Sequence, residues 1–113
     1  MAATYNIDVK RGATKTLVMT LTDANGDPLN LTGYSARSKV KANYNSDAVF
    51  SLTDTDGISL DPLVGKVTMT YSAARTGLLT AGRRYVWDIE LVSGDYVISP
   101  LAGYITVAPE VTD

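Results

Sequence analysis

The sequence predicts an all-β fold, a sandwich or barrel of about eight short strands, and two observations carry that prediction. Apolar and polar residues alternate with a period of two through most of the chain, as they do in half-buried strands. Clusters of Gly, Asn, Asp and Pro interrupt these runs roughly every 8–12 residues, the spacing of short strands joined by turns. The 113 residues contain no linker or repeat and suit a single domain over residues 1–113.

Alternation gives each expected strand of the first half a set of inward-facing side chains. The sets are Tyr5, Ile7 and Val9; Leu17, Met19 and Leu21; Leu29 and Leu31; Ala36, Ser38 and Val40; and Ala48, Phe50 and Leu52. Between the second and third sets, Asn25-Gly26 supplies the positive φ angles of a tight turn. Gly33 then interrupts the chain before the next strand.

The second half continues the alternation and contains its clearest strand. The inward-facing sets are Val67, Met69 and Tyr71, followed by Tyr85, Trp87, Ile89 and Leu91. Between these two sets, a short helical turn is expected near Ser72–Leu78, with Ser72 as its N-cap. Ser93-Gly94-Asp95 is expected to turn the chain into "YVIS" and then into a last strand within 101–109. Trp87 is the single tryptophan, and we expect it to be buried and to hold the fold together.

The composition excludes several classes of chemistry. The chain has no cysteine and no histidine, which removes disulfides, thiolate catalysis and the commonest general base and metal ligand. A formal net charge of −2 gives no general attraction to nucleic acid or to anionic membranes. The first residues lack the features of a signal peptide, and no apolar run approaches the roughly 20 residues of a membrane span. We therefore expect folding in a cytoplasm and predict no catalytic, metal-binding or cofactor-binding residue and no cofactor.

The stretch "DTDGISLD" shares the opening Asp-x-Asp of a calcium loop. Its candidate ligands are Asp54, Asp56 and Asp61, with Gly57 between them. The third ligand position, the closing glutamate and the flanking helices of an EF-hand are missing from the pattern. The segment is therefore expected to be a hairpin turn, with Gly57 at positive φ and the aspartates accepting hydrogen bonds from nearby backbone amides.

Asp88 and Glu90 share one face of the clearest strand at a spacing of roughly 6.5–7 Å, which is compatible with a pair of glycosidase carboxylates. Alternation puts them opposite Trp87, on the face expected to meet solvent. An exposed carboxylate keeps an ordinary pKa and is a poor general acid. A solvated strand face is therefore the expectation for this pair.

Basic residues could form patches at several places. They are Lys10, Arg11, Lys15, Lys39, Lys41, Arg83 and Arg84. Binding of single-stranded nucleic acid needs exposed aromatic platforms among such charges, and the aromatics are expected in the core instead. The charges are therefore expected to discourage the pairing of exposed sheet edges.

Three stretches, taken in order, resemble one group of proteins. "LTDANGDPLNLTGYSARSKV" (21–40) contains a D-x-x-G-x-P turn and then "LTGY" closely followed by "AR". "GKVTMTYSAARTGLLTAGRRYVWDIEL" (65–91) contains a G-x-[ILV]-T strand, "SAA", L-x-A-G and Y-x-[YW]-D-[IL]-[EQ]. With the final "GYITVAPEVTD", these features are similar to small structural proteins of tailed bacteriophages. In particular, they resemble the immunoglobulin-like N-terminal domain of phage baseplate upper proteins.

The resemblance implies an immunoglobulin-like β-sandwich of about seven to nine short antiparallel strands with one short helical turn. It implies a non-enzymatic structural component of a virion, in the tail, baseplate, neck, fibre anchor or capsid decoration. The implied partners are other virion proteins and copies of the chain itself in a symmetric array, without nucleic acid or membrane. The implied location is the virion, after folding in the host cytoplasm.

Docking is expected to use strand addition at sheet edges, with the binding energy coming from the two chain ends and one sheet face and not from a pocket. The ends are residues 1–4 and 108–113, which the pattern leaves unanchored. Outward-facing valines are expected at Val18, Val86, Val92 and Val97.

The alternative is a module that binds host-surface glycans through exposed aromatics. Its candidates are Tyr5, Tyr34, Tyr44, Tyr96 and Tyr104, about half of them expected to be buried and Tyr44 expected to be the most exposed. An enzyme ranks third, because histidine and cysteine are both missing.

Overall fold

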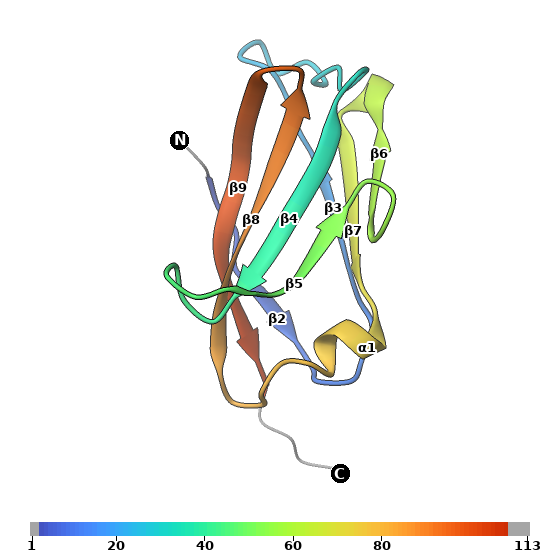
Figure 1. The fold of residues 1–113 in the computed structure, drawn as a ribbon. Helices are drawn as coiled ribbons and strands as arrows, with labels where there is room; N and C mark the ends of the chain where they lie inside the picture. Colours follow the sequence, from blue (N-terminus) through green and yellow to red (C-terminus); the bar gives the residue numbers. More distant parts are fainter. Residues whose placement is uncertain (1–2, 109–113) are drawn as a thin grey trace.

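A computed structural model of the chain describes residues 3–108, which form two β-sheets stacked as a sandwich (Figure 1). The strands are β1 (Ala3–Thr4), β2 (Ile7–Val9), β3 (Lys15–Thr20), β4 (Ser35–Lys41), β5 (Ala48–Thr53), β6 (Ile58–Asp61), β7 (Lys66–Tyr71), β8 (Arg84–Ser93) and β9 (Tyr96–Val107). A 3₁₀ turn, η1 (Pro62–Val64), joins β6 to β7, and one helical turn, α1 (Ala73–Thr76), follows β7.

The strand order is that of an immunoglobulin-like sandwich. The larger sheet, called sheet A, has the order β1–β9–β8–β4–β5, with β2 also pairing with β9. The smaller sheet, called sheet B, has the order β3–β7–β6. The predicted fold class is therefore confirmed. Among the named strands, β1 and β2 are the exceptions to antiparallel pairing, because both run parallel to β9.

The core between the sheets is built mostly from side chains that alternation assigned to it, with Leu79, Ile105 and Val107 in addition. The largest fully buried ones are Tyr71, Ile7, Leu31, Leu52, Met69, Leu79, Ile89, Leu91, Ile105, Val40, Val67 and Val107. Ser38 is also buried, as expected from its strand face, and its hydroxyl donates a hydrogen bond to the carbonyl of Asp88. Tyr5 differs from the prediction and is exposed, because β1 ends at Thr4 and the chain bends before β2.

Tyr85 closes the core at the end of the sandwich where β8 begins. Its side chain is buried, and its hydroxyl accepts a hydrogen bond of 2.9 Å from the backbone N–H of Thr80, five residues upstream. This arrangement is the tyrosine corner found in immunoglobulin-like domains. It fastens the connection from α1 to β8 against the strand that follows it.

Trp87, in the middle of β8, has a structural role, as the sequence predicted. Only 3% of its surface is exposed, and its indole Nε1 donates a 2.9 Å hydrogen bond to the carbonyl of Tyr5. Gly103 lies opposite Trp87 in the register and makes room for the bend between β1 and β2, because a Cβ at this position would overlap the Tyr5 carbonyl. Asn6 completes the attachment by accepting a 3.0 Å hydrogen bond from the N–H of Tyr104. The first strand is therefore held by contacts from both β8 and β9.

The predicted helical turn is present as α1, and Ser72 is its N-cap, accepting a 3.2 Å hydrogen bond from the N–H of Arg75.

The β8–β9 turn has Gly94 at φ +60° and no positive φ at Asp95, as in a type II′ hairpin. The two strands expected after this turn are one continuous strand, β9. Its register with β8 shifts near Pro100, where a bulge accommodates the missing N–H of proline.

Candidate interaction surfaces

Cross-strand charges dominate the outer face of sheet A. Arg37 on β4 lies opposite Glu90 on β8, and its Nε is 2.7 Å from the Glu90 carboxylate. Lys39 lies opposite Asp88 in the same pair of strands. Such pairs across neighbouring strands favour one register and keep the face hydrated. The face is therefore a mixed-charge surface.

Asp88 corrects the expectation of an exposed carboxylate with an ordinary pKa. Its side chain is half-buried between β4 and β9. This burial, together with repulsion from Glu90, raises the pKa of Asp88 despite the opposing charges of Lys41 and Lys39. Glu90, the other carboxylate on this strand face, forms an ion pair with Arg37. The two residues therefore form part of a ladder of charged side chains across β4 and β8.

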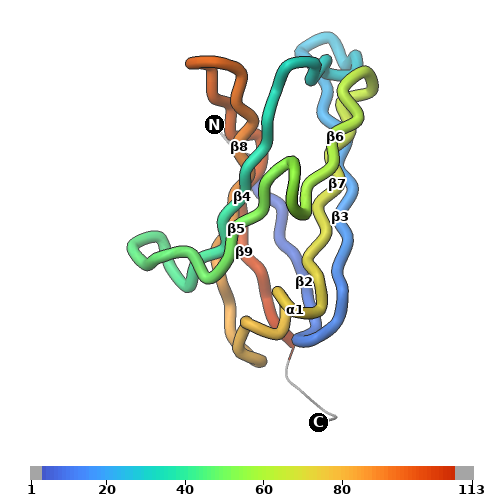
Figure 2. The backbone as a smooth tube through the Cα atoms, turned by 45° about the vertical axis from the view of Figure 1, so that its right-hand side comes forward, coloured from blue at the N-terminus to red at the C-terminus, as the bar shows by residue number. Residues whose placement is uncertain are grey.

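A small hollow lies beside Asp88 on this outer face. Its volume is about 160 Å³, and it is lined by Lys39, Lys41, Tyr44, Val86, Trp87, Asp88, Ser99 and Ala102. Tyr44 comes from the β4–β5 loop, which projects from the sandwich in Figures 1 and 2, and it is 73% exposed. An exposed ring, a carboxylate and two ammonium groups therefore meet around one shallow depression.

Threonine and serine dominate the outer face of sheet B. Thr16 pairs with Thr70, and Val18 pairs with Thr68, which in turn pairs with Ser59. Val18 is exposed, as the sequence predicted for an outward-facing valine. In contrast to sheet A, the three strands of this face carry one charged row, in which Lys66 lies between Thr20 and Asp61.

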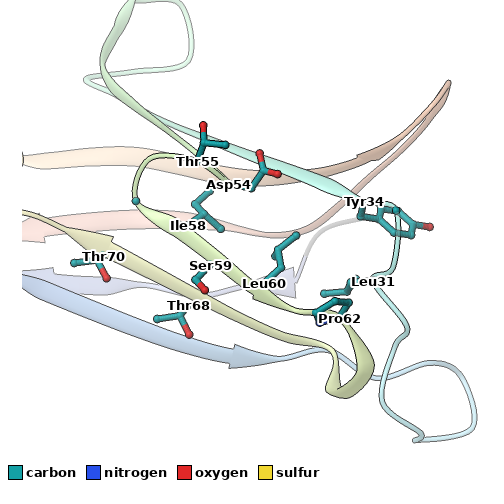
Figure 3. A pocket seen from close by; sticks show the side chains of 12 residues that line it. Leu31, Tyr34, Asp54, Thr55, Ile58, Ser59, Leu60, Pro62, Thr68 and Thr70 are labelled. Atoms are coloured by element: carbon teal, nitrogen blue, oxygen red, sulfur yellow. The ribbon is translucent and has the colours of Figure 1, made fainter.

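A groove of about 640 Å³ opens beside β6, between the β5–β6 turn and the segment that precedes β4 (Figure 3). Its lining includes Leu31, Tyr34, Asp54, Thr55, Ile58, Ser59 and Leu60. Within residues 3–108, β6 pairs only with β7, whereas Thr53 at the end of β5 also bridges to Gly57. The groove is therefore flanked by one sheet edge, that of β6, which can accept an added strand.

The "DTDG" segment is a turn, with Gly57 at φ +97° as predicted. Asp56 differs from the prediction of local amide contacts, because it accepts a 2.7 Å hydrogen bond from the Arg75 guanidinium in α1. That hydrogen bond and the positive charge lower the pKa of Asp56. Asp61 lies at the end of β6 opposite Lys66. Among residues 3–108, no group of three or more acidic side chains is arranged to hold a metal ion.

The basic residues correct the expectation that aromatics and bases are separate. The guanidinium of Arg84 lies 4.3 Å from the ring centroid of Tyr104, and that of Arg83 lies 5.8 Å from the ring centroid of Tyr85. Both pairs lie at the lower end of the sandwich, near Arg11, whose Nε donates to the carbonyl of Leu79. Sequence alternation alone could not find the Arg84–Tyr104 pair, because it joins the start of β8 to β9, whereas Arg83 and Tyr85 are two residues apart in the chain.

The tyrosines proposed for glycan binding are more exposed than expected. Tyr5, Tyr44, Tyr96 and Tyr104 are exposed, and Tyr34 is half-buried. The buried tyrosines are Tyr71 and Tyr85, which alternation had already assigned to the core. Tyr44 is the most exposed of the five candidates, as predicted.

The amino-terminal end differs from the prediction of an unanchored arm. Ala3 and Thr4 form β1 against Leu101 and Ala102, so this part of the amino-terminal arm belongs to sheet A. Ala108 donates a 2.9 Å hydrogen bond to Val9, and the remaining arm residues, 1–2 and 109–113, lie outside the described residues.

Of the predicted outer valines, Val97 is exposed, Val92 is half-buried and Val86 is buried. Val86 lies between Lys41 and Tyr104 in the strand register. Long neighbouring side chains of this kind cover small apolar ones on an outer face.

In residues 3–108, no helix is long and apolar enough to cross a membrane. No protein-family model matches the chain, and no curated protein matches it in a sequence comparison.

Proposed function

We propose that this protein is a non-enzymatic structural component of a tailed-phage virion, in the tail, baseplate, neck or capsid decoration, and that it acts by docking on other virion proteins and on copies of itself. The observation that carries the proposal is the ordered set of motifs in 21–40, 65–91 and 103–113, which resembles small phage structural proteins. The first two stretches contain the β3–β4 crossover and the β7–α1–β8 unit of the fold.

The surfaces support a docking role. Within the described residues, β3 and β6 each pair on one side only, which leaves their other edges open to strand addition. Large apolar side chains are exposed at Leu63, Leu78 and Tyr96, where a partner would cover them.

Purified particles test the proposal. Phage particles encoding the chain would be banded on a density gradient, and the bands would be analysed by quantitative mass spectrometry. We expect the chain in the particle band in a fixed ratio to the major structural proteins. Its presence only in the unassembled fraction of the lysate would refute the proposal. Cryo-EM density for the sandwich would then assign its place in the particle.

A second function is favoured by one observation, the hollow around Tyr44. Stacking of a sugar on an exposed ring, with hydrogen bonds to Asp88, Lys39 and Ser99, is a feasible mode of glycan binding. A glycan array probed with the wild-type chain and with Tyr44→Ala tests it. Tyr96→Ala removes an exposed tyrosine outside the hollow and is the matched control. Binding that is lost in Tyr44→Ala and kept in Tyr96→Ala would establish this function.

A further inference from the structure

The charges of the described residues are divided along the long axis of the sandwich, which extends about 45 Å. The upper end in Figures 1 and 2 is formed by residues 21–34, 61–66 and 94–96, and the lower end by residues 10–15 and 72–84. Hydrogen bonds join the segments within each end, from Leu31 to Pro62 above and from Thr76 to Ala13 below. The two ends are therefore separate surfaces at opposite poles.

The upper end, called the acidic end, carries aspartates. They are Asp23, Asp27, Asp61 and Asp95, all exposed, with Lys66 as the cation in this part of the described chain. The lower end, called the basic end, carries Lys10, Arg11, Lys15, Arg75, Arg83 and Arg84. Its acidic residues are Asp8 and the Arg75-bound Asp56, while Glu110 and Asp113 lie outside the described residues.

Each end also exposes apolar side chains among its charges. Leu63 and Tyr96 on the acidic end are 75% and 61% exposed. Leu78 on the basic end is 59% exposed and borders a shallow hollow lined by Arg11 and residues 77–81. Apolar side chains surrounded by polar and charged ones are the composition of a protein–protein interface. The two ends are therefore complementary in charge and alike in their apolar content.

Internal hydrogen bonds fix both ends before any contact is made. On the acidic end, the Asp23 carboxylate accepts hydrogen bonds from the N–H groups of Asn25 and Asp27. On the basic end, Arg11 donates to the carbonyl of Leu79. Surfaces that are already ordered lose little conformational freedom when they bind, which favours a weak contact repeated many times.

We infer that the acidic end of one copy of the chain docks on the basic end of the next copy, in a head-to-tail contact. This inference rests on the proposed function and gives its self-assembly a surface. A contact between two different patches is heterologous, so it generates a ring or a filament according to its rotation. Exposed charges are screened over a Debye length of about 10 Å at 0.1 M salt, so the association is expected to weaken steeply with salt.

Charge reversal tests the contact in the full-length chain. Sedimentation velocity at about 0.02 M and about 0.5 M salt should show association of the wild type only at the lower concentration. Asp27→Lys with Asp95→Lys makes the acidic end basic and leaves the Asp23 turn intact. Lys10→Glu with Arg83→Glu removes the net positive charge of the basic end. Each double variant alone should sediment as a monomer, because its two ends are then no longer opposite in charge.

An equimolar mixture of the two variants should associate, because the intact acidic end of one fits the intact basic end of the other. Asp47→Lys with Asp54→Lys changes the net charge by the same amount as the acidic-end variant, but at positions on the flanks. This control should associate like the wild type. Monomeric wild type at low salt, or equal loss in the flank control, would overturn the inference.

Two further results separate this inference from the alternatives. Retardation of a DNA duplex by the wild type, lost with Lys10→Glu and Arg83→Glu, would assign the basic end to nucleic acid and overturn the inference. A chain found in particles at fixed stoichiometry but unable to self-associate would refute the head-to-tail contact and leave the proposed function standing. Self-association in solution by a chain missing from particles would refute the proposed function instead.

Discussion

Alternate side chains along β8 enter two different environments, and their comparison separates stability from recognition. Tyr85, Trp87, Ile89 and Leu91 point into the core and are buried. Asp88 and Glu90 point outward, are half-buried and interact with cations of β4. Burial of one large apolar side chain contributes about 1.5–3 kcal/mol to the free energy of folding, whereas an exposed ion pair contributes about 0–1 kcal/mol. The outer face can therefore change for binding at little cost to the fold.

The largest loss of stability is expected from Trp87→Ala. The change removes a buried ring and the hydrogen bond to the Tyr5 carbonyl, so the free energy of unfolding should fall by about 3–5 kcal/mol. Urea unfolding measures it. Glu90→Ala, three residues away on the outer face, should lower the free energy by at most about 1 kcal/mol. Equal losses of unfolding free energy in the two variants would contradict the assignment of stability to the inner face of β8.

Gly103→Ala tests the inner side of β9 at the point opposite Trp87. The added methyl group would overlap the Tyr5 carbonyl and displace the bend between β1 and β2. We expect a loss of about 1–3 kcal/mol in thermal or urea unfolding. The neighbouring Ala102→Ser lies on the outer face and should change stability by no more than about 0.5 kcal/mol. A neutral Gly103→Ala would show that the amino-terminal strand is not held at this point.

Tyr71→Phe tests whether the buried Tyr71 hydroxyl stabilises or destabilises the fold. The Tyr71 hydroxyl is buried without a hydrogen-bond partner among the described residues, and burial raises its pKa far above the ordinary value. Its removal spares the cost of burying an unsatisfied group, so the variant should be more stable by about 1 kcal/mol. Differential scanning calorimetry checks the sign. A clear loss of stability would mean that the hydroxyl is hydrogen-bonded, for instance to a buried water.

The smallest effect concerns two aspartates whose pKa values move in opposite directions. Burial and Glu90 raise the pKa of Asp88 in the folded state, so its ionised form disfavours folding, and protonation at low pH removes that penalty. Asp88→Asn should therefore stabilise the protein at pH 7, and the gain should vanish below about pH 3.9. Arg75 lowers the pKa of Asp56, so its ionised form favours folding.

Asp56→Asn should accordingly reduce stability at pH 7, and the loss should fade as the pH falls through the lowered folded-state pKa. Thermal unfolding of both variants between about pH 3 and pH 7 compares them. Changes of the same sign at neutral pH would contradict the assignment of opposite environments to the two carboxylates.

The sequence alone determined the fold class, most of the core and the sites of the main turns. Period-two alternation depends only on the geometry of a strand, so it assigned Leu17, Met69 and Leu91 to the interior correctly. Gly57 and Gly94 marked turns because positive φ angles favour glycine. Ser72 marked the start of α1 because its hydroxyl can accept a hydrogen bond from the first turn.

Only the tertiary structure decided which residues from distant segments meet. The parallel pairing of β1 with β9, the burial of Val86 and Asp88 on an outer face, and the stacking of Arg84 on Tyr104 each join separate parts of the chain. The division of charge between the two ends arises in the same way, because the turns that carry aspartates are gathered at one pole and the basic ones at the other. Local periodicity reports the face of a strand, but neighbours across the sheet and at the ends follow from strand order and register, which alternation does not encode.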